Sequence, residues 1–268
     1  MGPKLTDAEF NKIVTFVQRD YGINLSQKRI LIEGRFSNFL NEKGFTNFSQ
    51  YLDFVFADKS GREMVNFINT VTTNHTFFWR EPRHFEYMQQ VVLPWIEKNV
   101  PDHSPRIWCA ASSSGEEPYT LCMVLDDYFS MKGDWDLRIL ASDIDTNILE
   151  KAKAAVYSAE SMKDLPPAWK KKYFKQIGDD KFQIIDRLRK NVIYREFNLM
   201  NKIVCKSPYH LISCRNVMIY FEAPTKNDLV ERFYDVTRPG GFLFVGHAES
   251  VSKTSRWKYM EPAIYRRV

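Results

Sequence analysis

Long apolar runs are missing from the sequence, and no segment approaches the roughly 20 residues that a membrane-spanning helix needs. The stretch from Met1 to Asp7 lacks the apolar region of a secretory signal. The four cysteines form no CxxC pair and have no metal-ligand spacing with the five histidines. These absences argue against membrane insertion, a disulfide framework and a bound metal. We therefore expect a cytoplasmic protein with reduced thiols.

Two further absences narrow the possible classes of enzyme. No GxGxxG motif follows the first predicted strand, which disfavours a NAD-dependent oxidoreductase. No Pro-Pro pair follows the fourth predicted strand, where methyltransferases of nucleic-acid bases often carry one. The net charge is only +5 over 268 residues, so no nucleic-acid partner is expected, although an acidic protein partner would fit. The length predicts one or two domains.

Residues 1–72 predict a small all-α domain. Thr6 and Glu9 have the spacing of a capping box. Apolar residues recur at helical spacing in four segments, at about 6–21, 26–43, 48–56 and 60–71. The second segment carries three basic residues, Lys28, Arg29 and Arg35. Such a group is typical of a solvated helix face, and a docking surface is the alternative.

Residues 73–105 are predicted to lead into a second domain at 106–268. The run Phe77-Phe78-Trp79 is too aromatic for a linker that provides only flexibility, and a helix is expected to follow it. His75 and His84 lie in this region. We interpret both as structural, because no partner spacing supports a metal site.

From Arg106 onward strands and helices alternate, which is the pattern of an α/β fold. A buried strand runs into a tight turn at Gly115, and a helix begins at Glu116-Glu117-Pro118. Open α/β sheets bind ligands at such a turn. Two acids disfavour a phosphate and suit a ligand with hydroxyls, an ammonium or a sulfonium. The turn therefore indicates S-adenosylmethionine (SAM) rather than a dinucleotide, with a plain βα turn as the alternative.

The second strand of the sheet is expected from Leu137 and is followed by two acids, Asp143 and Asp145. An acid at the end of the second strand holds the ribose diol in nucleotide-binding α/β folds. Asp143 is the candidate for this role, and helix capping is its alternative. Asp145 is adjacent to the expected helix start at Thr146, so we interpret it as the cap.

Residues 158–196 interrupt the alternation and carry a net charge of +4. Residues 181–186 and 191–197 are predicted to pair as strands of a small antiparallel insertion, whose second strand leads back to the main sheet. The run 169–174 suits an amphipathic helix, with nucleic-acid binding as the alternative. The predicted fold class is thus α/β, a Rossmann-like, mostly parallel sheet of the SAM-methyltransferase type. It carries a small antiparallel β insertion and follows an all-α N-terminal domain.

Five motifs occur in a fixed order, and a sixth lies beyond them. They are Thr73–Arg80, Ala111–Tyr119, Ala141–Thr146, Phe197–Leu199 and Cys214–Phe221, followed by Gly246–Glu249. Together they resemble the bacterial chemotaxis receptor methyltransferases, the CheR family, over almost the whole chain. Trp79 stands where phenylalanine is usual in that family, and Ser114 where threonine is common.

The resemblance implies that the methyl group of SAM is transferred to glutamate side-chain carboxylates of chemotaxis receptors. The products are glutamate methyl esters, which serve sensory adaptation, and S-adenosylhomocysteine. The implied partner is the cytoplasmic helical region of these receptors, and in some members a receptor C-terminal tail that binds the β insertion. We expect the enzyme to act as a monomer.

The resemblance also places nine residues around SAM: Asn74, Thr76, Arg80, Glu117, Asp143, Asn198, Leu199, Arg215 and Asn216. Asp143 suits the ribose hydroxyls. Glu117 can balance the cationic part of SAM or share the ribose. Asn198 and the backbone of Leu199 are expected at the end of the third strand, where they suit the adenine edge.

Arg80 and Tyr220 are the candidate catalytic residues. The planar fork of Arg80 matches a carboxylate, either that of SAM or that of the substrate glutamate. Tyr220 suits orientation of the methyl group or of the acceptor oxygen, with a packing role as the alternative. Two other functions stay open, a SAM-dependent methyltransferase of another substrate and a SAM-binding signalling module without turnover.

Overall fold

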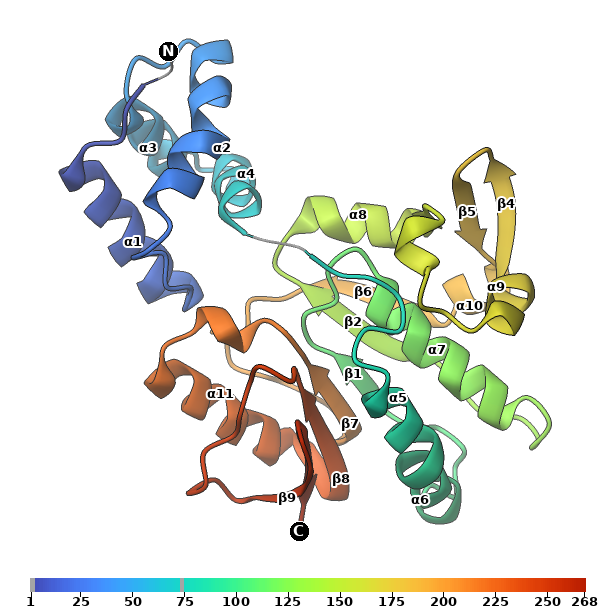
Figure 1. Ribbon diagram of the computed structural model, residues 1–268. Coiled ribbons are helices and arrows are strands. Elements are labelled where there is room, and N and C mark those ends of the chain that lie inside the picture. Colours follow the sequence, from blue (N-terminus) through green and yellow to red (C-terminus); the bar gives the residue numbers. More distant parts are fainter. Residues whose placement is uncertain (1–2, 73–74) are drawn as a thin grey trace.

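The computed structural model describes residues 3–72 and 75–268 and places four helices ahead of a twisted sheet (Figure 1). The helices are α1 (Asp7–Tyr21), α2 (Arg29–Glu42), α3 (Phe48–Ala57) and α4 (Arg62–Val71). The capping box is present at α1, where Glu9 N donates to Thr6 Oγ1 (3.3 Å) and Thr6 N donates to Glu9 Oε2 (2.9 Å). All four expected helices therefore form, although α2 begins a few residues later than predicted.

The helical domain has a core of its own, built on aromatic rings. The Phe36 ring of α2 packs against Tyr51 of α3 and Phe67 of α4, with centroids 5.5 and 5.4 Å apart. Two basic residues of α2 are used inside the domain. Arg29 pairs with Asp7, and Arg35 donates to the carbonyl oxygen of Thr70 (2.9 Å). These two guanidinium groups thus tie α2 to the beginning of α1 and the end of α4.

The aromatic segment after the helical domain packs firmly against the second domain. Phe78 is fully buried, and the Trp79 ring stacks on Phe85 with centroids 5.1 Å apart. The expected helix forms as three consecutive elements: α5 (Arg83–Tyr87), a π-helical turn η1 (Met88–Val92) and α6 (Leu93–Asn99).

The main sheet has seven strands in the order β6-β2-β1-β7-β8-β10-β9. The strands are β1 (Ile107–Cys109), β2 (Ile139–Asp143), β6 (Val192–Glu196), β7 (Tyr209–Cys214), β8 (Thr237–Val245), β9 (Trp257–Glu261) and β10 (Ile264–Arg267). Pairing is parallel from β6 to β8 and antiparallel on both sides of β10. The chain reverses its direction of winding between β1 and β7, and ligands of open α/β sheets bind outside such a switch point.

Helices cover both faces of this sheet, and the central strands β1 and β7 are accordingly buried along their whole length. One face packs against α5, α6, α7 (Glu116–Phe129) and α8 (Thr146–Ala154). The other packs against α11 (Ala223–Val236), which follows the short 3-10 turn η3 (Met218–Tyr220). This is the mostly parallel, Rossmann-like architecture that the sequence predicts.

The insertion differs from its prediction in strand pairing. It contains β3 (Val156–Tyr157), η2 (Glu160–Met162), α9 (Pro167–Tyr173), β4 (Phe174–Gly178), β5 (Lys181–Ile184) and α10 (Asp186–Arg189). Its antiparallel sheet has the order β3-β5-β4. The predicted pairing of 181–186 with 191–197 is wrong, because 192–196 forms β6 and pairs with β2 of the main sheet. The amphipathic helix at 169–174 is confirmed as α9, with Trp169 and Tyr173 buried.

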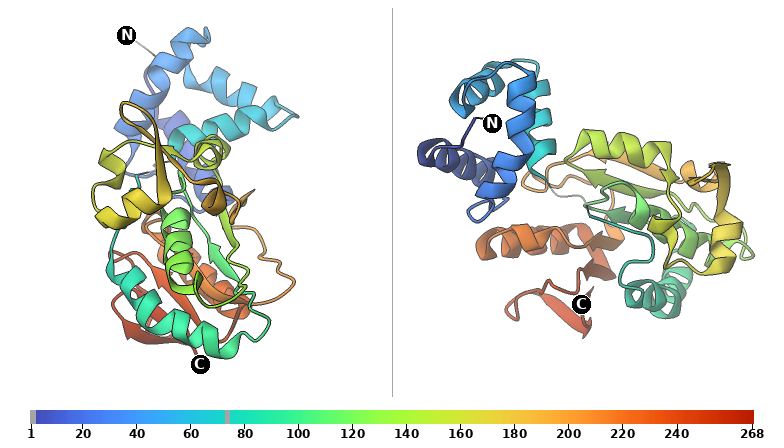
Figure 2. Two further views of the ribbon diagram at one scale, coloured as in Figure 1. Left: turned by 90° about the vertical axis from the view of Figure 1, so that its right-hand side faces the viewer. Right: turned by 45° about the horizontal axis from the view of Figure 1, so that its top comes forward.

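Both views of Figure 2 show the helical domain as a separate body seated on one end of the α/β domain. Helix α4 lies against α8 at this junction. Over the described residues, none of the helices combines the length and the apolar character that crossing a membrane requires.

Candidate active site

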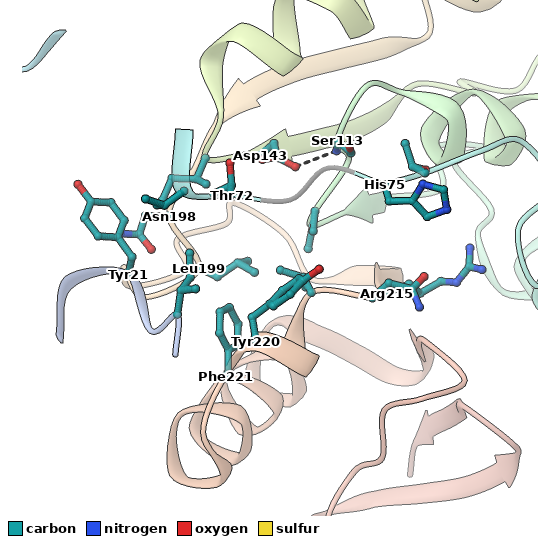
Figure 3. A pocket seen from close by; sticks show the side chains of 18 of the residues that line it. Tyr21, Thr72, His75, Ser113, Asp143, Asn198, Leu199, Arg215, Tyr220 and Phe221 are labelled. Atoms are coloured by element: carbon teal, nitrogen blue, oxygen red, sulfur yellow. Dashed lines mark hydrogen bonds between the residues drawn. The ribbon is translucent and has the colours of Figure 1, made fainter. Parts of the chain in front are cut away.

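A cavity lies at the junction of the two domains, beside the switch point of the sheet (Figure 3). The helical domain contributes side chains from the α1–α2 connection and from the ends of α2 and α4: Tyr21, Ile23, Asn24, Leu25, Lys28, Leu31, Val71 and Thr72. The α/β domain contributes the segments that follow β1, β2, β6 and β7. The site is therefore built by both domains.

Every predicted site residue that the structure describes lines this one cavity: Thr76, Arg80, Glu117, Asp143, Asn198, Leu199, Arg215, Asn216 and Tyr220. Asn74 lies outside the described residues. Figure 3 shows Asp143 and Tyr220 on opposite sides of the same space. Residues far apart in the sequence thus converge as the motif order suggests.

The turn after β1 requires glycine at position 115. Gly115 has a φ of 98°, and a Cβ atom there would lie 2.7 Å from the Tyr157 hydroxyl and 2.8 Å from the Tyr194 hydroxyl. Ser113, two residues earlier, has a φ of 47° and directs its N–H at Asp143 Oδ2 (2.8 Å). The turn therefore holds an acid of the neighbouring strand.

Asp143 is fixed at the end of β2 by two backbone donors, Ser113 N and Asp145 N (3.1 Å to Oδ1). Burial raises the pKa of Asp143, and these N–H groups oppose the rise. An oriented carboxylate at a cavity wall suits a ligand diol. Asp145 does act as the cap of α8, because its Oδ1 accepts from Ile148 N (2.9 Å).

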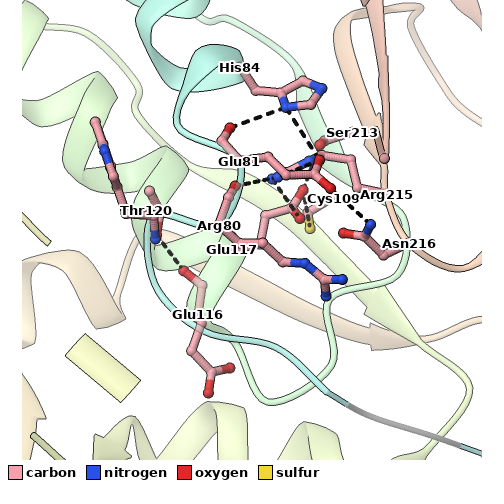
Figure 4. Close-up of polar contacts among 12 residues, drawn as sticks. Arg80, Glu81, His84, Cys109, Glu116, Glu117, Thr120, Ser213, Arg215 and Asn216 are labelled. Carbon is pink, nitrogen blue, oxygen red and sulfur yellow. Dashed lines mark hydrogen bonds and ion pairs between the residues drawn. The ribbon is translucent and has the colours of Figure 1, made fainter. Parts of the chain in front are cut away.

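Arg215 is the buried centre of a charged network and is only 4% exposed (Figure 4). Its Nη1 lies 3.0 Å from Glu117 Oε2, and its Nη2 lies 3.2 Å from Glu81 Oε2 and also donates to the Arg80 carbonyl. Glu117 Oε1 accepts from Ser213 Oγ (2.5 Å). Arg215 and Glu117 thus hold each other, and both terminal nitrogens of the guanidinium are engaged by protein oxygens.

Glu81 was not predicted from the sequence, yet it connects this network to the end of β8. Its carboxylate accepts from the Asn216 side-chain amide (3.1 Å) and from His247 N (3.2 Å), besides Arg215. Burial opposes ionisation of Glu81, but the Arg215 charge and these hydrogen bonds outweigh it and lower the pKa. Glu81 therefore remains a carboxylate at neutral pH.

Arg80 presents its charge differently from Arg215. Its Nη1 donates to the His75 carbonyl (2.8 Å), and its guanidinium lies 5.7 Å from the centre of the Phe77 ring. Trp79 and Glu81, on either side of it, have positive φ angles of 62° and 57°. Within 3–72 and 75–268 no carboxylate forms an ion pair with Arg80. A half-buried cation without an acidic partner suits a ligand carboxylate.

His84, predicted to be structural, is fully buried beneath this network. Its Nδ1 lies 3.3 Å from the Glu81 carbonyl. Burial, together with the Arg215 charge, lowers the pKa of His84 to about 3, so the ring is neutral. Glu81, His84 and His247 lie within 4.8 Å of one another, but the donors described above already occupy the Glu81 carboxylate.

The connection between α1 and α2 forms the other wall and was missed by the sequence reasoning. Asn24 N donates to the Tyr220 carbonyl (2.8 Å), and Ile23 forms a β-bridge with Phe221. Asn198, predicted near adenine, uses its side-chain amide to donate to the Asp20 carbonyl (2.9 Å). These contacts join the domains directly beside Tyr220, and no motif in the helical domain signals them.

The parallel sheet, the glycine turn after β1 and the oriented acid after β2 define the class of a SAM-dependent methyltransferase. Profile comparison agrees: the CheR methyltransferase SAM binding domain matches residues 74–265, and the CheR methyltransferase all-alpha domain matches residues 8–72. The chain belongs to the CheR methyltransferase family, and SAM is its co-substrate.

Curated relatives extend over nearly the whole chain. The chemotaxis protein methyltransferase of Borreliella burgdorferi is 36% identical over 98% of this chain and 95% of its own. Chemotaxis protein methyltransferase 2 of Vibrio cholerae is 35% identical, covering 94% of this chain and 88% of its own. The chemotaxis protein methyltransferase of Escherichia coli is 36% identical, covering 94% and 87%.

Proposed function

We propose that the protein transfers the methyl group of SAM to glutamate side-chain carboxylates of chemotaxis receptors, acting as a monomer in the cytoplasm. The observation that carries this proposal is Arg80, which forms no ion pair with a carboxylate of residues 3–72 or 75–268, in a cavity that also holds the oriented Asp143. Such a site suits a ligand diol at Asp143 and a carboxylate at Arg80. The relatives are named chemotaxis protein methyltransferases, which supports a chemotaxis protein as the acceptor.

The roles of the lining residues follow from their contacts. Asp143 binds the ribose hydroxyls, and the backbone at Asn198 and Leu199 receives the adenine edge. Thr76, which lines the cavity, completes this part of the wall around SAM. Arg215 holds Glu117 in place, and Asn216 holds Glu81. Both therefore act through these carboxylates rather than by contacting the ligand.

The reaction needs no general base. A glutamate carboxylate has an ordinary pKa of about 4.3 and is the nucleophile at neutral pH. Its oxygen attacks the methyl carbon as the bond from carbon to sulfur breaks, which leaves a neutral ester and neutral S-adenosylhomocysteine. Because charge disappears, alignment contributes more than fixed charge, and such positioning is worth roughly 7–11 kcal/mol. Arg80 holds a carboxylate in line, and Tyr220 fixes the approach.

The decisive experiment incubates the protein with methyl-labelled SAM and receptor-containing membranes. Base treatment should release the label from the receptor as volatile methanol, because only a carboxyl methyl ester hydrolyses in this way. Label that resists base would indicate a methyltransferase of another group. SAM binding without any transfer would indicate a signalling module without turnover.

A second part of the proposal concerns the β insertion, which we infer to bind a receptor C-terminal tail. Strand β4 is an edge of the three-stranded sheet, and Lys175, Gln176 and Ile177 on it are exposed. An edge strand with free backbone groups can accept a further strand. The positive charge of the insertion suits an acidic tail.

A further inference from the structure

The carboxylate of Glu249 lies buried beside the ends of β7 and β8, and the residue is only 7% exposed. Glu249 closes the turn after β8, in which its own N–H donates to the Gly246 carbonyl (2.8 Å). It belongs to the Gly246–Glu249 motif, to which the proposed reaction assigns no role. Its contacts nevertheless lead directly to the cavity.

Three backbone N–H groups donate to this carboxylate. Oε2 accepts from Asn216 (2.9 Å) and Gly246 (2.5 Å), and Oε1 accepts from Ile219 (3.1 Å). An ionised carboxylate is an acceptor only, so it matches a set of donors from two directions. A side-chain amide of the same shape would turn its NH₂ group toward one part of this set. The site therefore selects a carboxylate rather than a generic polar group.

The segment that Glu249 holds has little regular structure of its own. Asn216 has a φ of 58°, a left-handed conformation that costs a residue other than glycine about 1 kcal/mol. The turn η3 that carries Tyr220 is three residues long. Gly246 leaves room for the contact, because a Cβ there would lie 2.4 Å from Asn216 Nδ2 and 2.8 Å from Glu249 Oε2. The conformation of residues 216–220 is thus determined by contacts with the neighbouring turn Gly246–Glu249.

We propose that Glu249 is a positioning residue for methyl transfer. Its carboxylate fixes the backbone at Asn216 and Ile219, and thereby places Asn216 and Tyr220 in the cavity wall. Glu249 itself contacts neither SAM nor the acceptor and acts through Tyr220. The inference rests on the proposed function, because the place of Tyr220 affects turnover only if the methyl group is transferred beside it.

Glu249→Gln in the full chain tests this role, with Glu231→Gln as the matched control. Glu231 is a carboxylate of α11 that accepts from Ser255 and Arg256 away from the cavity. Receptor methylation by Glu249→Gln should show kcat lower by about tenfold or more, while KM for SAM changes by less than about threefold. The control should keep the kcat of the unmodified protein.

A double-mutant cycle with Tyr220→Phe separates positioning from general destabilisation. If Glu249 acts through Tyr220, Tyr220→Phe should lower kcat much less in the Glu249→Gln background than in the unmodified protein. Additive losses, or a kcat per SAM-binding site that Glu249→Gln leaves unchanged, would overturn the proposal. Glu249→Asp, which keeps the charge but has a shorter reach, should give an intermediate kcat.

Amide hydrogen exchange gives a readout that needs no receptor. Exchange at the Asn216 and Ile219 amides should be about tenfold faster in Glu249→Gln and Glu249→Asp than in Glu231→Gln, since these two amides donate to the Glu249 carboxylate. Unchanged exchange would refute the positioning role even if activity fell. Faster exchange in a protein that binds SAM but methylates no receptor would refute the proposed function and leave the contact established.

Discussion

The guanidinium of Arg215 lies 3.0 Å from the carboxylate of Glu117, and this largely buried pair lies where β7 ends and α7 begins. Arg215 also lies between Glu117 and Glu81, so one cation holds two carboxylates from separate segments. Because the two carboxylates share one cation, loss of Arg215 would leave both of them without this partner.

Removing the cation should therefore be more harmful than removing one anion. Arg215→Met should lower the free energy of unfolding by about 3–5 kcal/mol, because two largely buried carboxylates lose their partner. Glu117→Gln should cost less, since Arg215 keeps Glu81. Urea denaturation followed by circular dichroism would measure both variants, and equal losses would contradict this account of the network.

Asp143→Ala should weaken SAM binding while the fold is retained. The side chain faces the cavity, and truncating a hydrogen-bonded charge in a site costs a few kcal/mol, or about ten- to a hundredfold in affinity. Asp145→Ala is the matched control, because it removes the cap of α8 and should cost about 1 kcal/mol of stability. Calorimetry that finds equal SAM affinity in both variants would exclude the ribose role of Asp143.

Turnover should depend on alignment and not on a titrating base. We expect kcat to be nearly constant between about pH 6 and 8.5, without a histidine-like step near 6.5. Arg80→Ala should be slower than Arg80→Lys, and Tyr220→Phe should reduce kcat more than it weakens SAM binding. Single-turnover measurements across this pH range test the mechanism. A step near neutrality that disappears on replacing His75 would show that a base takes part.

Acid should destabilise the protein in part through His84. Its pKa in the fold is about 3, below the ordinary value of 6.5, so only the unfolded chain binds this proton between those values. The free energy of unfolding should therefore fall as pH drops from 6.5 toward 3, by up to about 1.4 kcal/mol per pH unit. His84→Gln should flatten this slope.

Charge reversal on the insertion should affect receptor recognition alone. Lys171→Glu with Lys175→Glu should raise the KM for a receptor with an acidic C-terminal tail, while SAM affinity holds. Both lysines are exposed. Arg187 and Arg189 are unsuitable targets, because they pair with Asp126 and Asp186 inside the protein.

Lys253→Glu with Lys258→Glu is the matched control for this prediction, since it makes an equal change in charge at two exposed lysines before and on β9. A receptor that lacks its tail should not distinguish the variants. Equal KM values for the full-length receptor would exclude a tail-binding role of this face.

Local pattern was enough to predict the part of the site that lies within single segments. The glycine turn, Asp143 and the capping Asp145 follow from one strand-turn-helix pattern each, because neighbouring residues determine the geometry. The strand at 181–184 was recognised, but its partner was not, since alternation of side chains does not encode which strand lies alongside.

The contacts at the domain junction could not be predicted from local sequence patterns for a related reason. Asn24 and Glu222 are 198 residues apart and still form a hydrogen bond beside Tyr220. Glu81 likewise depends on Arg215 and Asn216, which no spacing rule connects with it. Contacts of this kind use ordinary polar residues, so no sequence motif marks them.

The shared cavity has a consequence for how the two domains stay together. Tyr21 and Lys28 line it from the helical domain, and Asp143 and Tyr220 line it from the α/β domain. A molecule that touches both walls acts as a reversible crosslink. By thermodynamic linkage, association of the helical domain with the α/β domain increases the affinity for SAM. Bound SAM favours this association by the same factor. The occupied enzyme should therefore melt as one cooperative unit.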